Sequence, residues 1–183
     1  MEKREKFSNK LLMILFILFL IWILLQFLAP FSLPQGSIDD LSGVIGVEDN
    51  KKSIDNIILP WSSIYSAGDR LCHQKSERSF YLNGNQMPFC SRCTGIWLGL
   101  AIGLGFMFFY KVELDNKFVY AIIIGLAPIG IDGFGQLFGF WESTNIIRLI
   151  TGLLSGGICG ISIGVIIDEF KELKIKNIFS KPE

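Results

Sequence analysis

Residues 90–110 read CSRCTGIWLGLAIGLGFMFFY. A short polar segment with two cysteines leads directly into residues 94–110, which carry no charge. At 1.5 Å per residue, a helix over residues 94–110 is about 25 Å long, which is short but close to the thickness of a bilayer core. The stretch therefore predicts a membrane-spanning helix that starts beside a cysteine pair.

Three further apolar blocks of spanning length occur in the chain: residues 11–29, 118–140 and 145–167. Half of the 183 residues are hydrophobic, and they form long blocks rather than the periodic pattern of a soluble domain. A cleaved signal peptide is the other interpretation of the first block, but that block is too long and no small-x-small cleavage site follows Pro30. We predict an all-α, polytopic membrane protein with four transmembrane helices and a long extracytoplasmic loop between helices 1 and 2.

The distribution of charge indicates how the chain is divided and oriented. The terminal segments and residues 111–117 together carry ten Lys or Arg, whereas residues 32–93 carry six. Positive charges in a loop as long as residues 32–93 have little influence on the orientation of a protein in the membrane. We therefore predict a multi-pass protein of the cell membrane with both termini cytoplasmic. The predicted segments are a charged leader with the first transmembrane helix (1–31), an extracytoplasmic loop (32–69), the Cys/His motif with a three-helix membrane core (70–167) and a charged cytoplasmic tail (168–183).

Polar side chains recur along the last two predicted spans. Asp132 and Gln136 lie one turn apart, while Asn145, Arg148 and Thr151 recur every three residues. A tight turn between the spans would bring Asp132 within reach of Arg148, and an ionisable group inside a membrane normally faces a partner or a cavity. The pair either only fixes the helix register or belongs to a functional site. The additional polar groups at the same depth favour the site.

Glycines recur at intervals of four in two of the predicted helices, at positions 95, 99 and 103 and at positions 156, 160 and 164. Small residues at this spacing let helix backbones pack closely in lipid. We expect the second and fourth spans to be in contact. Homo-oligomerisation through either glycine-rich face is the alternative. Cys159 lies among these glycines and is expected to be a small packing residue.

The remaining three cysteines precede or open the second span, and three kinds of cysteine chemistry fit them. The first is a zinc site, whose predicted ligands are Cys72, His73, Cys90 and Cys93. Adjacent residues rarely bind one ion, so His73 could instead support a ligand, with water as the fourth ligand. The second is a thiol–disulfide oxidoreductase that uses the C-x-x-C pair. The third is a disulfide that only staples the loop.

Basic and amide side chains around these cysteines suggest a ligand site. The candidates for ligand or cofactor binding are Arg78, Arg92, Gln136 and Asn145. Guanidinium groups at a membrane edge suit an anionic lipid or an anionic small molecule, so a non-catalytic membrane module that binds a lipid head group or a partner is a further alternative. Catalysis is left open, with Asp132, Arg148 and His73 as candidates. The net charge is zero, so no overall positive potential favours binding to nucleic acid. The expected partner is the lipid bilayer.

Several separated motifs resemble a family of small prokaryotic predicted membrane proteins of unknown function. The matching motifs are Cys72-His73-Gln74, Arg78-Ser79-Phe80, Pro88-x-Cys90-x-Arg92-Cys93-Thr94-Gly95, Asp132-Gly133 and Asn145-x-x-Arg148-x-x-Thr151-Gly152. The resemblance covers roughly residues 70–165 and excludes the first predicted helix. It implies no activity, but it implies that these residues define the family.

Overall fold

The computed structural model describes residues 6–179 and the side chains of residues 10–171. Residues 1–5 of the predicted leader and residues 180–183 of the predicted tail lie outside this range. The elements in chain order are α1 (Lys6–Phe31), α2 (Lys51–Ile54), α3 (Trp61–Leu71), the 3₁₀ helix η1 (Ser76–Arg78), β1 (Tyr81–Leu82), β2 (Asn85–Gln86), α4 (Ser91–Phe109), α5 (Asn116–Leu137) and α6 (Asn145–Phe179).

Four helices are long and apolar enough to cross a membrane: Lys10–Phe31, Ser91–Phe109, Asn116–Leu137 and Asn145–Lys171. Their mean hydropathy ranges from 1.5 to 3.0. The prediction of an all-α membrane protein with four spans is confirmed, and the only strands in the described part form one two-stranded hairpin. The last helix extends beyond the predicted span and through most of the predicted tail, as far as Phe179.

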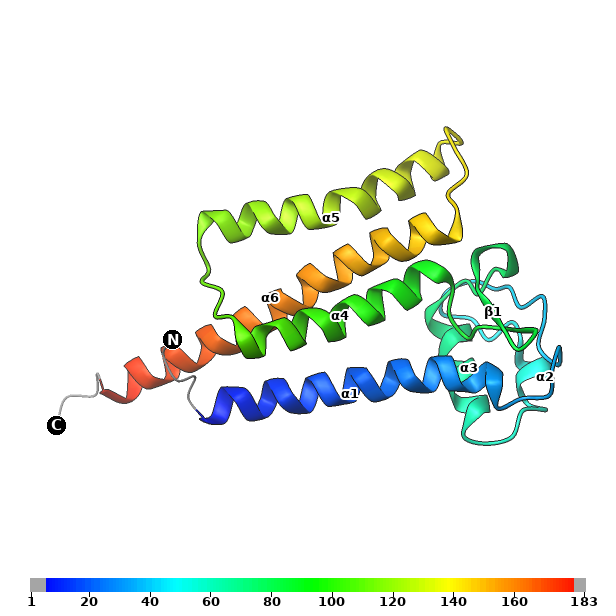
Figure 1. Ribbon diagram of the computed structural model, residues 1–183, viewed down its shortest axis with the longest axis horizontal. Helices are drawn as coiled ribbons and strands as arrows, with labels where there is room; N and C mark the ends of the chain where they lie inside the picture. The colour runs from blue at the N-terminus through cyan, green and yellow to red at the C-terminus, as the bar shows by residue number, and fades with distance from the viewer. Residues whose placement is uncertain (1–5, 180–183) are drawn as a thin grey trace.

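The four long helices lie side by side in the order α5, α6, α4, α1 (Figure 1). The apolar windows of the two outer helices, α1 and α5, are 17% buried, whereas those of the two inner helices are 39% buried. Large apolar side chains therefore cover the outside of the row, and exposed examples include Ile14, Ile124 and Phe134. An apolar exterior of this extent is the surface expected of helices that face lipid.

The two central helices pack backbone against backbone through their glycines. A Cβ at Gly99 would lie 2.3 Å from the carbonyl oxygen of Leu153, and one at Gly156 would lie 2.1 Å from that of Ile96. The predicted contact between the second and fourth spans is confirmed, and both glycine rows are used within a single chain. Cys159 was expected to be a small packing residue, but its side chain is exposed on α6.

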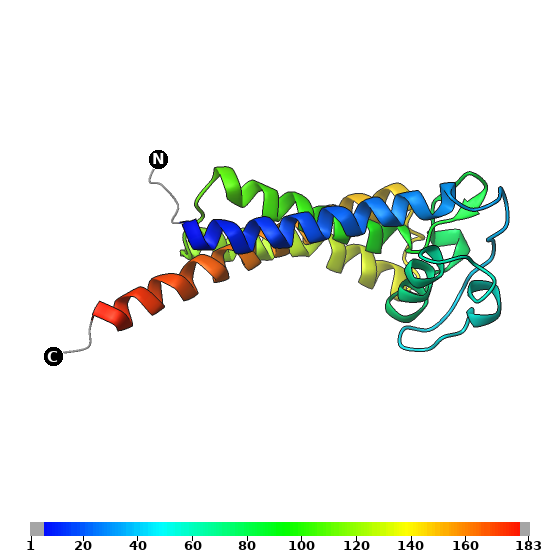
Figure 2. The same ribbon diagram turned by 90° about the horizontal axis from the view of Figure 1, so that it is seen from below.

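The segment between α1 and α4 folds into a small unit at one end of the helices. This unit lies at the end where α5 finishes and α6 begins, and α1 begins at the opposite end in both views (Figures 1 and 2). Its core contains Leu41, Ile54, Ile64 and Tyr65, and it packs against Ala29 of α1. The arrangement places the cysteine motif beside the α5–α6 turn, which lies far from it in the sequence.

Candidate functional site

Three cysteines come together where the loop unit meets α4. The sulfur atoms of Cys72, Cys90 and Cys93 all lie within 4.8 Å of one another, and the three thiols are free. Among the described side chains, this is the only group of three or more His, Cys, Asp or Glu arranged so that it could hold a metal ion. A tetrahedral zinc site with Zn–S bonds of about 2.3 Å requires sulfur separations of about 3.8 Å, so the cluster has a suitable size.

Each cysteine is held at the end of a helix. Cys72 follows the last residue of α3 in an extended conformation and is 2% exposed. Cys90 is the N-cap residue of α4, and Cys93 lies in the first turn of that helix. The backbone N–H of Cys90 donates to the sulfur of Cys72 over 3.4 Å. The cluster therefore depends on the contact between the end of α3 and the start of α4.

A network of buried amides holds these two helix ends together. The Gln74 side chain donates to the carbonyl oxygens of Tyr65 (3.2 Å) and Pro88 (2.8 Å), and thus joins α3 to the segment before Cys90. The Gln86 side chain in turn donates to the carbonyl oxygen of Gln74. Both glutamines are fully buried. Gln74 belongs to the Cys-His-Gln motif, and its side chain ties α3 to the segment before Cys90.

A close backbone contact at Gly68 completes this join. A Cβ at Gly68 would lie 1.9 Å from the carbonyl oxygen of Pro88, so no larger residue fits between α3 and the segment that carries Cys90. Gly68, Gln74 and Gln86 were not predicted as site residues, although Gln74 belongs to the Cys-His-Gln motif. Buried glutamines in a polar loop are a weak signal, because their side chains are usually solvated.

Hydrogen bonds among the thiols shift the pKa values of the cysteines in different directions. Hydrogen bonds from Cys72 and Cys93, together with backbone N–H groups of the first helical turn, lower the pKa of the Cys90 thiol far below its ordinary value. The hydrogen bond with Cys90, assisted by burial, raises the pKa of Cys72 to about 11. Cys90 is thus the thiol that carries negative charge most readily, as expected at a helix N-terminus.

His73 follows Cys72 directly but does not belong to the cluster. Its side chain is exposed and no atom of it is part of the group of three sulfurs. Its backbone carbonyl accepts a hydrogen bond from the N–H of Gly43 over 2.8 Å. The structure therefore brings together three of the four predicted metal ligands. The three sulfurs alone do not complete the four ligands that a structural zinc site normally has.

The buried carboxylate of Asp132 has a different partner from the predicted one. Arg92, which lies between the two cysteines of the C-x-x-C motif, forms an ion pair and a hydrogen bond with Asp132. The prediction that Arg148 pairs with Asp132 is wrong, because the Arg92 side chain reaches the carboxylate from a third helix. Ser143 and Trp141, from the α5–α6 turn, lie beside the same carboxylate.

Arg148 and Asn145 lie at the start of α6 and meet the loop. The Arg148 guanidinium donates to the side-chain oxygen of Asn145 over 3.1 Å, and the Asn145 amide donates to the carbonyl oxygen of Ser79 over 3.2 Å. Ser91 at the start of α4 donates to the carbonyl oxygen of Arg78 over 2.9 Å. The segment at residues 78–79 is therefore fastened to the first turns of both α4 and α6.

Gln136, like His73, stays apart from the predicted site residues that come together. It lies one turn after Asp132 on α5 and is half-buried. Within the described residues, no hydrogen bond joins its side chain to Asp132, Arg148 or the cysteines.

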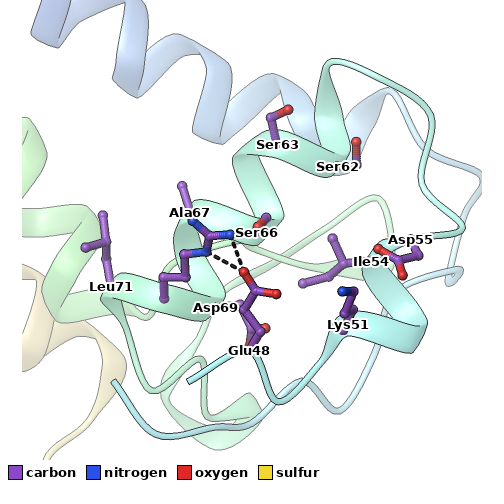
Figure 3. A pocket seen from close by; sticks show the side chains of 11 residues that line it. Glu48, Lys51, Ile54, Asp55, Ser62, Ser63, Ser66, Ala67, Asp69 and Leu71 are labelled. Atoms are coloured by element: carbon purple, nitrogen blue, oxygen red, sulfur yellow. Dashed lines mark hydrogen bonds and ion pairs between the residues drawn. The ribbon is translucent and has the colours of Figure 1, made fainter. Parts of the chain in front are cut away.

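A pocket of about 560 Å³ lies elsewhere on the loop unit, between α2 and α3 (Figure 3). Arg70 and Glu48 form an ion pair at this pocket, and Ser62 and Ser66 line it. None of the predicted site residues lines the pocket. Its buried carboxylate, Asp69, is occupied by hydrogen bonds from Asn50. The pocket is thus a separate surface feature and not an extension of the cysteine cluster.

Comparison with known families gives this arrangement a context. Residues 72–166 match the family described as "Predicted membrane protein (DUF2085)". The chain belongs to this family. The match begins at Cys72 and ends within α6. The DUF2085 region therefore contains the cysteine cluster, helices α4 and α5, and the arginines at positions 78, 92 and 148. The family resemblance seen in the sequence motifs is confirmed.

Two archaeal proteins are similar to this DUF2085 chain. An uncharacterised protein of Methanocaldococcus jannaschii is 33% identical over 152 residues, which cover 81% of this chain and 86% of that protein. An uncharacterised protein of Methanothermobacter thermautotrophicus is 42% identical over 86 residues, which cover 47% of this chain and 78% of that protein. No solved structure matches the chain.

Proposed function

We propose that this DUF2085 protein binds zinc through Cys72, Cys90 and Cys93 at the membrane edge. The observation that carries the proposal is the convergence of three free sulfur atoms within 4.8 Å of one another. Two chain segments supply these sulfurs, and a buried glutamine network holds the segments in place. Three thiolates favour a soft or borderline metal ion over magnesium or calcium.

Three protein ligands leave a fourth position for zinc. Structural zinc sites are normally closed by four protein ligands, whereas a site with three and an exchangeable water resembles a catalytic one. His73 is the nearest residue in the chain that could close the site, because it follows Cys72 directly. A zinc site with His73 would be structural, and one with water would be open to a membrane-embedded reaction.

Metal content provides the first test. Protein purified in detergent is expected to contain about one zinc per chain, and Cys90→Ser or Cys93→Ser should lose it. Cys72→Ser should lower the affinity by more than the roughly 10- to 100-fold that is expected when a residue that only supports a ligand is lost. Cys159→Ser is the matched control, because that cysteine is exposed and lies outside the cluster, and it should keep full zinc content. Elemental analysis of the purified variants measures each result.

Chelation and pH separate zinc from redox chemistry. Protons compete with zinc for the thiolates, so zinc should be lost as the pH falls and regained as it rises. A chelator should likewise expose three thiols without any reductant. Protein without metal, in which two of the three thiols appear only after dithiothreitol, would instead identify a thiol–disulfide oxidoreductase and overturn the zinc site.

His73→Ala decides whether the fourth ligand is the histidine. If His73 closes the site, this variant should bind zinc much more weakly than the wild type. If water occupies the fourth position, zinc affinity should change little. Competition with a chromogenic chelator gives the two affinities directly.

A further inference from the structure

Three arginines from separate segments gather beside the cysteine cluster. Arg78 ends the 3₁₀ helix η1, Arg92 lies in the first turn of α4, and Arg148 lies in the first turn of α6. The hydrogen bonds described above fasten the segment that carries Arg78 to both helices. The helices themselves touch here, since a Cβ at Gly152 would lie 2.4 Å from the carbonyl oxygen of Arg92. The backbone segments that carry the three arginines are therefore held against one another.

The three side chains form a series from the surface to the interior. The side chain of Arg78 is 37% exposed, that of Arg92 is 25% exposed, and Arg148 as a residue is 5% exposed. In each of the three, the Nε atom is buried and has no hydrogen-bond partner. Buried donors without partners are costly and rare in folded proteins. One buried acceptor beside them, Oδ1 of Asp132, also has no partner, so the three unpartnered donors still outnumber the acceptors available to them.

The protein's own carboxylates do not balance this cluster. Asp132 is the buried carboxylate, and it pairs with Arg92. Glu77 is exposed, and its contact with the Nε of Arg78 is a 3.5 Å ion pair rather than a hydrogen bond. The charges of Arg78, Arg92, Asp132 and Cys90 all act on Arg148. Two carboxylates, one of them exposed, face three guanidinium groups, so the carboxylates leave one positive charge unbalanced.

From this geometry we infer that Arg78, Arg92 and Arg148, together with the Asn145 amide, bind a phosphate group. A phosphate carries up to two negative charges and several acceptor oxygens, which suits guanidinium groups close enough for their charges to act on one another. The N-termini of α4 and α6 add favourable dipoles at the same place. These helix starts are the ends of two spans, which is the depth of lipid head groups. The phosphate of a lipid and free phosphate share this chemistry.

The test uses the full chain in dodecyl maltoside, a detergent without phosphate. Inorganic phosphate is titrated in one arm and phosphatidic acid in the other, with diacylglycerol as the lipid control that lacks the phosphate. Calorimetry and the thermal unfolding midpoint report binding. Saturable binding in the first arm identifies free phosphate, and binding in the second arm alone identifies a lipid head group. Binding in neither arm would overturn the inference.

Arginine variants test whether these residues form the site. Arg78→Gln should weaken binding about tenfold, the effect expected for one charge-assisted hydrogen bond. Arg148→Gln should weaken it at least as much, and Arg148→Lys should restore only part, because lysine keeps the charge but loses the planar donor group. Arg70→Gln is the matched control, because Arg70 lies on the loop unit and pairs with Glu48. If Arg148→Gln does not fold, the binding affinity of Arg78→Gln alone tests the site. Unchanged affinity in Arg78→Gln would contradict the site.

The zinc site and the phosphate site can fail independently. Phosphate binding should persist in Cys90→Ser, because the donors are the arginines and not a metal ion. Zinc loss with retained phosphate binding would therefore leave the inference standing. Binding that is lost in Cys90→Ser but unchanged in Arg78→Gln would assign the anion to the metal ion and overturn the arginine site.

Discussion

At the scale of single residues, Arg92 connects the cysteine motif to the membrane core. It lies one residue before Cys93, so its side chain leaves α4 about 100° away from the cysteine and faces another element. That direction leads to Asp132 on α5. The argument from sequence started from the short α5–α6 turn, which brings residues near it together, and it therefore favoured Arg148. The actual partner lies at the far end of α4, 40 residues away from Asp132.

The corrected pairing predicts the outcome of a double-mutant cycle. Asp132→Ala leaves Arg92 without its carboxylate, and breaking a largely buried pair costs on the order of 3 kcal/mol. The double variant Asp132→Ala with Arg92→Ala should be less destabilised than the sum of the two single variants. Thermal unfolding in detergent measures each variant. The same cycle with Arg148→Ala serves as the comparison, and a larger coupling there would restore the sequence-based pairing.

At the scale of elements, the glycine rows of α4 and α6 decide how the membrane core packs. Their spacing of four could be read from the sequence because it puts every glycine of a row on one helix face. Helix α3 was not predicted, although its buried residues Ile64, Tyr65 and Gly68 follow a helical period. The rest of that segment includes three serines, Asp69 and Arg70, and such polar residues are also typical of an irregular loop.

Substitution of one interface glycine should separate the two central helices. Gly99→Ala would put a methyl group 2.3 Å from the carbonyl oxygen of Leu153, so the backbones must move apart. Overpacking of this kind costs about 1–3 kcal/mol, and the folded yield and thermal midpoint should fall. Gly130→Ala is the control on α5, where a new methyl group meets nothing within 4 Å. Because alanine has a higher helix propensity than glycine, Gly130→Ala should be neutral or stabilising, and an equal loss in both variants would contradict close packing at Gly99 as the cause.

At the scale of the whole molecule, the sequence predicted the membrane helices better than the site. Four apolar blocks are sufficient to locate the spans, because bilayer thickness and backbone hydrogen bonding allow few alternatives. The C-x-x-C motif likewise located two members of the cysteine cluster. The roles of Gln74 and Gln86 could not be predicted, because they depend on contacts between α3 and the hairpin. His73 illustrates the same limit, since adjacency to Cys72 does not bring its ring to the cluster.

At the same scale, the distribution of Lys and Arg predicts that both termini are cytoplasmic and that the loop unit is extracytoplasmic. The loop unit and the connection between α4 and α5 lie at opposite ends of the helices (Figure 1). A membrane-impermeant maleimide applied to intact cells should label Ser63→Cys, an exposed position on α3. Glu113→Cys, exposed in the opposite connection, should be labelled only after lysis. Wild-type protein, with its clustered thiols, provides the background. If Glu113→Cys is labelled on intact cells and Ser63→Cys only after lysis, the loop unit is cytoplasmic. The zinc and phosphate sites would then draw their ligands from the cytoplasm.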